Sequence, residues 1–196
     1  MIGVAFPASA LSARLGGSAD IASDHALLRI LGRRGANDLK KHFRSRNSTP
    51  NKLGGRRSNF WLQVASSVQS PVIAGTSSVR IDITHPAYAQ KLYGGTITAK
   101  RAKFLTIPVH PQAYGRTAAV FERETGIELF RPQTSEGVLV RLLMGIGPDG
   151  GLTVYYVLKR SVTQKADPNA FPNRETFADG LTEEARKYTL RKLKAK

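Results

Sequence analysis

Apolar residues recur at helical spacing near both ends of the chain and at strand spacing between them. Helical spacing runs from Ser23 to Phe43 and again from Asn173 to Lys196. Between these stretches, Val79 to Ile83 alternates apolar and charged residues, as a half-buried antiparallel strand does. The patterns predict an α+β fold, which is a mostly antiparallel β-sheet flanked by helices. We expect a long N-terminal helix, an extended hairpin and a C-terminal helix.

Local signals define the expected elements and domains further. Ser23 or Asp24 can cap the N-terminal helix, while Gly32 and Gly35 weaken its middle, where a break can occur. Further strands are expected over residues 71–74, 126–130, 138–144 and 152–159. We predict an N-terminal extension over residues 1–22, one α+β domain over 23–170 and a basic C-terminal helix over 171–196.

The net charge is strongly positive. The 30 lysines and arginines exceed the 14 aspartates and glutamates, which gives +16 at pH 7. Such a balance predicts an acidic partner, which can be nucleic acid, an anionic membrane or an acidic protein surface. No stretch approaches the ~20 apolar residues of a membrane helix, so we expect no membrane partner. No signal peptide is expected either, because its basic and apolar regions are missing.

The sequence offers no recognisable catalytic or metal-binding pattern. Cysteine is absent, which excludes disulfides, cysteine zinc sites and thiol nucleophiles. The four histidines show none of the spacings of a metal site. The carboxylates in the middle of the chain are scattered, and we expect solvated surface charges at Asp82, Glu122, Glu124, Glu128 and Asp149. We therefore predict no enzyme, no catalytic residue, no metal and no cofactor.

A run of basic residues extends from the N-terminal helix into the loop that follows. The candidates for contact with DNA or an acidic partner are Arg33, Arg34, Lys40, Lys41, Arg44, Arg46, Lys52, Arg56 and Arg57. Asp38 is the one acid within this run. Charges of one sign at this density repel each other unless something acidic lies opposite. We predict such a partner, either DNA backbone or protein, and the alternative is a solvated helix face with its loop.

A glycine pair precedes a second basic cluster. Gly94 and Gly95 permit a tight turn, and we expect Thr96 to Pro108 to form a hairpin with a basic turn. The candidate residues for a subunit interface or a channel are Gly94, Gly95, Thr96, Ile97, Lys100, Arg101, Lys103 and Phe104. The alternative role of these cations is to discourage edge-to-edge aggregation of the sheet.

Three stretches together carry a resemblance to a known family. The first is Asn51 to Gly55 with the basic pair that follows, the second runs from Tyr88 to Gly115, and the third is Leu158 to Pro168. Over residues 50–170 the chain resembles the phage virion morphogenesis family of Mu-like and related tailed phages, which is associated with tail completion. The most specific part is the Gly94 to Pro108 segment, which reads GGTITAKRAKFLTIP.

The resemblance implies a structural virion protein without catalytic residues. Such a protein completes or terminates the tail, or connects head and tail in the neck, as a homo-oligomeric ring, most often a hexamer. Its other partners are neck or tail proteins such as tube, sheath, head-completion or connector proteins, and non-specifically the genomic DNA in the channel. It is located in the virion after assembly in the host bacterial cytoplasm. The alternative that stays open is a non-specific nucleic-acid-binding protein whose basic run contacts phosphates.

Overall fold

The long N-terminal helix begins at its predicted cap. The computed structural model describes residues 1–7, 24–48 and 59–194, and α3 (His25–Arg46) is capped by Asp24. The Asp24 carboxylate accepts hydrogen bonds from the backbone N–H groups of Ala26 and Leu27, at 2.9 and 3.2 Å. This is the standard arrangement of an aspartate N-cap, because the first N–H groups of a helix have no partner within it.

The sequence allowed a break in the N-terminal helix at Gly32 and Gly35, but α3 is continuous there. Gly32 and Gly35 are buried within the continuous helix. A Cβ atom on Gly32 would lie 2.7 Å from the Cβ of Pro71, and one on Gly35 would lie 3.2 Å from Ile81. The glycines therefore allow the helix to approach the residues beneath it more closely than any larger side chain would permit.

The first sheet has the strand order β1-β3-β2 and is antiparallel throughout. It consists of β1 (Ile2–Pro7), β2 (Val72–Ala74) and β3 (Ser78–Ile83). The alternation predicted for β3 is confirmed, since Val79, Ile81 and Ile83 are buried. Within the predicted N-terminal extension, residues 2–7 thus form a strand of this sheet, and residues 8–22 lie outside the described part of the chain.

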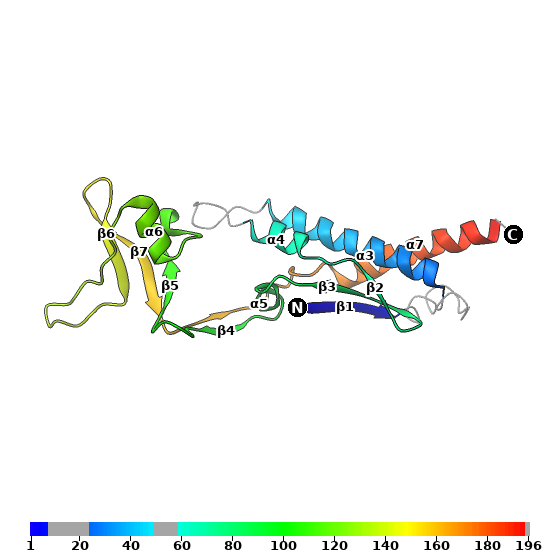
Figure 1. The fold of residues 1–196 in the computed structure, drawn as a ribbon, viewed down its shortest axis with the longest axis horizontal. Helices are drawn as coiled ribbons and strands as arrows, with labels where there is room; N and C mark the ends of the chain where they lie inside the picture. Colours follow the sequence, from blue (N-terminus) through cyan, green and yellow to red (C-terminus); the bar gives the residue numbers. More distant parts are fainter. Residues whose placement is uncertain (8–23, 49–58, 195–196) are drawn as a thin grey trace. The chain divides into compact units, whose positions relative to one another are not determined.

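Helices cover this sheet on one side (Figure 1). They are α3, the short helix α4 (Phe60–Ser66) and the C-terminal helix α7 (Arg174–Lys194), which lies along α3, while the short helix α5 (Tyr88–Tyr93) lies near one end of the sheet. The core between them contains Leu31, Leu39, Phe43, Ile81, Tyr88, Phe177 and Leu181. The predicted C-terminal helix is confirmed, and it contributes buried residues to this core.

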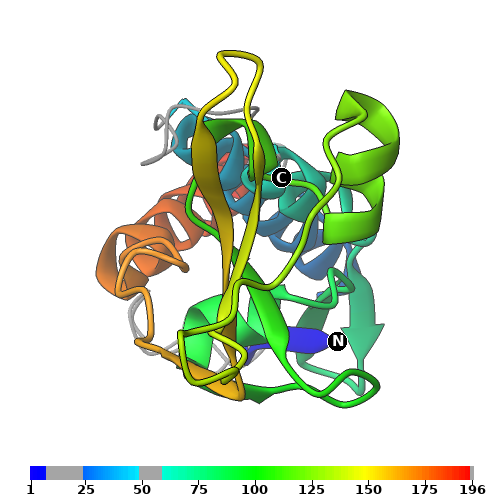
Figure 2. The same cartoon turned by 90° about the vertical axis from the view of Figure 1, so that its left-hand side faces the viewer.

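The second group of elements is built from two antiparallel sheets. In one, β4 (Gly95–Thr98) pairs with β8 (Ser161–Gln164). In the other, β5 (Leu105–Pro108), β7 (Leu152–Lys159) and β6 (Leu142–Ile146) have the order β5-β7-β6. The turn predicted between the last two strands is confirmed, and Figure 2 shows the resulting β6–β7 hairpin in yellow. The 3-10 helix Pro111–Ala113 and α6 (Ala118–Thr125) complete this group.

The hairpin predicted over Thr96 to Pro108 is wrong in its pairing. Both predicted strands exist, but β4 pairs with β8 and β5 with β7. Thr98 is opposite Ser161 and Leu105 is opposite Lys159, so residues 99–104 bulge out opposite the single residue Arg160. The pattern of residues gives strand spacing but not the partner, because a strand can pair with any strand that the tertiary fold brings alongside. We call residues 99–104 the basic bulge.

The chain divides into two compact units, and the α+β class is confirmed. Among the described residues, the first unit comprises 1–7, 24–48, 59–94 and 165–194, and the second comprises Gly95–Gln164. The predicted domain over residues 23–170 therefore falls into both units, and the C-terminal helix belongs to the first. The strands of the described residues form three small sheets, where the sequence led us to expect one.

Candidate interaction surfaces

The basic bulge collects cations from several segments of the second unit around one aromatic ring. The Lys103 ammonium nitrogen lies 5.9 Å from the centre of the Phe104 ring. The guanidinium carbons of Arg131 and Arg141 lie 5.6 and 5.9 Å from the same point. Each cation faces the electron-rich ring, an arrangement worth about 0.5–1 kcal/mol at an exposed site.

Two further cations come from the strand opposite the bulge. Lys159 is paired with Leu105, and the carbonyl of Arg160 accepts a hydrogen bond from the Ala99 N–H at 3.3 Å. With the bulge residues they form what we call the basic cluster: Lys100, Arg101, Lys103, Arg131, Arg141, Lys159 and Arg160. Within the described part of the chain, none of these side chains forms an ion pair, and all except the half-buried Arg131 are exposed.

Sequence reasoning found only the bulge half of this cluster. The sequence predicts Lys100, Arg101 and Lys103 as a group because they are close together in the chain. The other four members are Arg131, Arg141, Lys159 and Arg160. They are far from the bulge in the sequence, and the tertiary fold brings their segments beside it. One signal existed, since Arg141 interrupts the apolar run of residues 138–144. Gly94 to Ile97, which were predicted to belong to the same interface or channel, precede the bulge in the chain. There Thr96 is opposite Thr163 in the β4–β8 pair, and the two hydroxyl groups form a hydrogen bond at 2.9 Å.

An irregularity in β7 determines which side chains face the core of the second unit. The register between β6 and β7 shifts after Leu143, which is opposite Tyr156, to Met144, which is opposite Val154. Tyr155 is left without an opposite residue, and both Tyr155 and Tyr156 are buried against Phe121. Such a β-bulge places two consecutive side chains on one face of the strand.

The other face of the β5-β7-β6 sheet is apolar. Opposite residues of an antiparallel pair share a face, so Phe130, Met144 and Val154 lie on the face away from the core. Ile146 and Leu152 continue that face and are each 62% exposed, and Phe130 is 43% exposed. We call these five residues the outer face. None of them belongs to a hydrophobic core cluster of the described residues. Contiguous exposed apolar residues of this kind typically mark an interaction site.

The structure separates the basic residues predicted on α3 into two groups. Arg34 forms ion pairs with Asp38 at 2.8 Å and Glu184 at 3.6 Å. Arg46 forms an ion pair with Asp167 at 2.8 Å and lies over the Trp61 ring. These two side chains hold the first unit together, and a partner is not needed to explain them.

The remaining predicted cations of α3 face outward. Arg33, Lys41 and Arg44 are exposed and Lys40 is half-buried. No ion pair involves any of these four among the residues that the structure describes. Lys52, Arg56 and Arg57, the last members of the predicted run, lie outside the described residues. The outward-facing cations therefore form a stripe along one helix, spread over about 17 Å between the first and the last.

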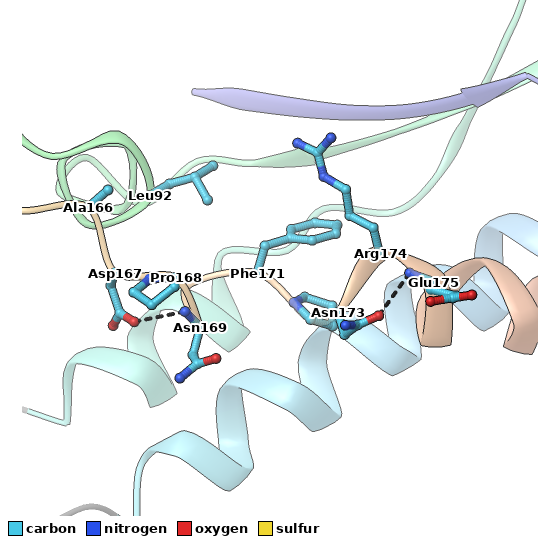
Figure 3. A pocket seen from close by; sticks show the side chains of 10 residues that line it. Leu92, Ala166, Asp167, Pro168, Asn169, Phe171, Asn173, Arg174 and Glu175 are labelled. Carbon is cyan, nitrogen blue, oxygen red and sulfur yellow. Dashed lines mark hydrogen bonds between the residues drawn. The ribbon is translucent and has the colours of Figure 1, made fainter.

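A pocket of the first unit is lined mainly by the loop before α7, and two of its polar side chains, Asp167 and Asn173, already have partners (Figure 3). Asp167 binds Arg46 and accepts a hydrogen bond from the Asn169 N–H at 3.0 Å. Asn173 accepts the N–H of Glu175 at 2.9 Å, at the start of α7. In Figure 3 the Arg174 and Glu175 side chains point in different directions. The pocket is thus formed by a loop that anchors α7, and its polar groups do not converge on a ligand.

Tyr88 and His42 are titratable groups whose hydrogen bonds go to the backbone. The Tyr88 hydroxyl donates to the Ala170 carbonyl at 3.1 Å, and burial raises its pKa above the ordinary value. Burial likewise lowers the pKa of His42, whose Nε2 lies 3.0 Å from the Asn169 carbonyl oxygen. The charged side chains that act on the pKa of His42 are Arg46 and Asp167, and these two form an ion pair with each other.

The described residues contain neither a metal-ligand cluster nor a membrane-spanning helix. Within residues 1–7, 24–48 and 59–194, no group of three His, Asp or Glu residues is placed to hold a metal ion. In that same part of the chain, no helix combines the length and the apolar character needed to cross a membrane. Comparison of the chain with protein-family models, curated proteins and solved structures finds no match in any of the three.

Proposed function

We propose that this chain is a non-enzymatic structural protein of a tailed-phage particle that completes the tail or joins the tail to the head. In this proposal it assembles as a homo-oligomeric ring, a hexamer, within the tail or neck of the virion. The ring contacts neighbouring neck or tail proteins and is assembled in the cytoplasm of the host bacterium. The resemblance of residues 50–170 to the phage virion morphogenesis family supports this assignment.

The observation that carries the proposal is the outer face. Ile146 and Leu152 are large aliphatic side chains at the end of a hairpin, and water covers most of each. Burying such a side chain at an interface stabilises the assembly by roughly 1.5–3 kcal/mol. Repeated around a ring, the same contact recurs at every interface, and the ring closes when the rotation between neighbouring subunits adds up to a full turn.

Size-exclusion chromatography with light scattering tests the proposal on the full chain. We expect one oligomeric species for the native protein and a shift to monomer for the double variant Ile146→Glu/Leu152→Glu. The matched control is Leu62→Glu/Val72→Glu, which changes two apolar residues that are 45% and 54% exposed in the first unit. A native protein that stays monomeric at high concentration would contradict the proposal, and so would equal dissociation of both variants.

A further inference from the structure

Three cations of the basic cluster lie close together around one aromatic ring. Lys103, Arg131 and Arg141 each lie within 5.9 Å of the Phe104 ring centre, so no two of these charges are more than about 12 Å apart. Lys159 and Arg160 flank the same bulge through strand pairing, and Lys100 and Arg101 lie within it. Four separate segments of the second unit thus supply cations to one site.

Nothing acidic within the described residues neutralises this charge. The acidic side chains that form ion pairs do so with other cations: Arg34, Arg46, Arg80, Arg116, Lys187 and Lys192. Two like charges 12 Å apart in water repel by about 0.3 kcal/mol, and salt screens this further. The repulsion between the cations is therefore too small to destabilise the fold when no ligand is bound. An anion with several charges is attracted by all the cations of the cluster together.

The stripe on α3 is another region with cations outside ion pairs, and it is less suited to bind a polyanion. Its four cations are spread along one helix, and the paired side chains of Arg34, Asp38 and Glu184 lie on the same helix or beside it. Carboxylates beside a cationic surface repel a polyanion and reduce its attraction. The basic cluster has no such acidic neighbour in an ion pair, so we expect it to dominate anion binding.

We propose that the basic cluster binds the phosphate backbone of nucleic acid without reading its sequence. Duplex DNA presents one negative charge per about 1.7 Å of its axis on a stiff scaffold, and each neutralised phosphate releases counterions. An acidic peptide must instead be ordered at a cost of about 1–2 kcal/mol per residue to present a comparable array. Arginine contributes four members of the cluster, and its planar fork of donors matches the phosphate geometry. Arg131 contributes mainly its charge, because its guanidinium already donates hydrogen bonds to the carbonyls of Val140 and Leu139, each at 3.1 Å.

Binding by the basic cluster does not depend on the proposed ring. The cluster lies in the second unit, whereas the basic run predicted from the sequence lies in α3 and the following loop. Contacts to phosphate fix position but carry no sequence information. We therefore expect the affinity for duplexes of different sequence to agree within about a factor of three, and to fall steeply with salt.

The test is the salt dependence of binding to a labelled DNA duplex, measured by fluorescence anisotropy between about 50 and 200 mM salt. The variant is Lys100→Gln/Arg101→Gln/Lys103→Gln, and the matched control Arg33→Gln/Lys41→Gln/Arg44→Gln removes the same charge from exposed positions of α3. Each phosphate contact contributes about 0.9 to the slope of log K against log salt. We expect the slope to become shallower by about 2–3 in the variant and by less than 1 in the control.

Three results would overturn the inference. One is an equal loss of slope in the two triple variants, which would indicate non-specific attraction by the whole charge. Another is competition by polyglutamate at charge concentrations equal to the DNA, which would identify an acidic protein surface as the ligand. The third is unchanged DNA binding by the bulge variant when its circular dichroism spectrum and melting temperature match those of the native protein. Binding that persists in the monomeric Ile146→Glu/Leu152→Glu variant would separate this inference from the ring.

Discussion

Two helical glycines, Gly32 in α3 and Gly180 in α7, show how the space around a residue decides whether a larger side chain fits there. Gly32 lies where the helix passes over Pro71, and a Cβ atom there would be 2.7 Å from the Pro71 Cβ and 3.0 Å from Val79. Gly180 in α7 is different, because its nearest side-chain atoms would be 3.5 and 3.6 Å away, at ordinary contact distance. Helix propensity treats the two positions alike, so the difference between them comes from packing alone.

Replacement by alanine is expected to have opposite signs at these two glycines. Gly32→Ala gains about 1 kcal/mol of helix propensity but loses about 1–3 kcal/mol to overpacking, so we expect the free energy of unfolding to fall. Gly180→Ala keeps the gain, and we expect a rise of about 0.5–1 kcal/mol. Urea unfolding followed by circular dichroism measures both. Stabilisation by Gly32→Ala would mean that α3 does not approach Pro71 this closely.

At the scale of elements, the N-terminus of α3 is tied to the C-terminal part of α7. The Asp24 carboxylate accepts hydrogen bonds from the Lys192 ammonium at 2.8 Å and the Tyr188 hydroxyl at 2.9 Å, besides capping its own helix. The pKa of Asp24 is lowered from 3.8 to about 2, although burial acts in the opposite direction. The hydrogen bond from Lys192 has the largest effect, and the hydrogen bonds from Tyr188, Leu27 and Ala26 add to it. The Asp24 carboxylate therefore caps α3 and also connects it to α7.

The lowered pKa of Asp24 gives a pH dependence with a definite sign. A depressed carboxylate pKa contributes stability that is present above pH 3.8 and is lost as the pH falls through about 2. We expect Asp24→Ala to reduce the free energy of unfolding at neutral pH by at least about 1 kcal/mol, with the difference from the native protein shrinking below pH 3.8. Stability curves from pH 7 to 2 measure this.

Asp24→Asn separates the two roles of this residue. Asparagine is an equally good N-cap but carries no charge for Lys192, so this variant is expected to be more stable than Asp24→Ala at neutral pH. It should also lose most of the pH dependence below pH 3.8 that the native residue contributes. Equal stability of the two variants at neutral pH would show that the cap does not contribute, and only the contact with α7 does.

At the scale of the whole molecule, the chain has separate hydrophobic cores in its two units. Phe43 belongs to the core of the first unit, together with Ile81, Tyr88 and Phe177. Phe121 belongs to the core of the second unit, together with Tyr155 and Tyr156. The second core contains fewer buried residues, so we expect the second unit to open at a lower free energy than the first.

A pair of core truncations tests this division. Phe121→Ala is expected to cost about 3–5 kcal/mol within the second unit and to leave the first intact. Hydrogen exchange followed by mass spectrometry should then show loss of protection over residues 105–108, 142–146 and 152–159, with α3 and β3 still protected. Phe43→Ala is the reciprocal variant, with loss expected in α3 and β3. Uniform loss of protection in either variant would indicate one cooperative unit.

The sequence by itself determined the class of fold and several of the local elements, but the strand expected over residues 126–130 is reduced to a bridge at Phe130 and the one expected over 138–144 is β6, Leu142–Ile146. The N-cap at Asp24, the alternation of β3 and the periodicity of α7 depend on interactions within a few residues, which is why spacing and residue type were sufficient to predict them. The net charge, and its implication of an acidic partner, also required nothing beyond composition. The predictions of function, ring and absence of catalysis remain predictions at this level.

The tertiary structure decided what depends on residues far apart in the chain. It paired β4 with β8 and β5 with β7, since strand spacing does not specify a partner, and so it converted an expected hairpin into a bulge. It kept α3 continuous through Gly32, because close packing on Pro71 outweighs the low helix propensity of glycine. It also placed Arg131 and Arg141 beside Phe104, because residues far apart in the sequence become neighbours only when the chain folds back on itself.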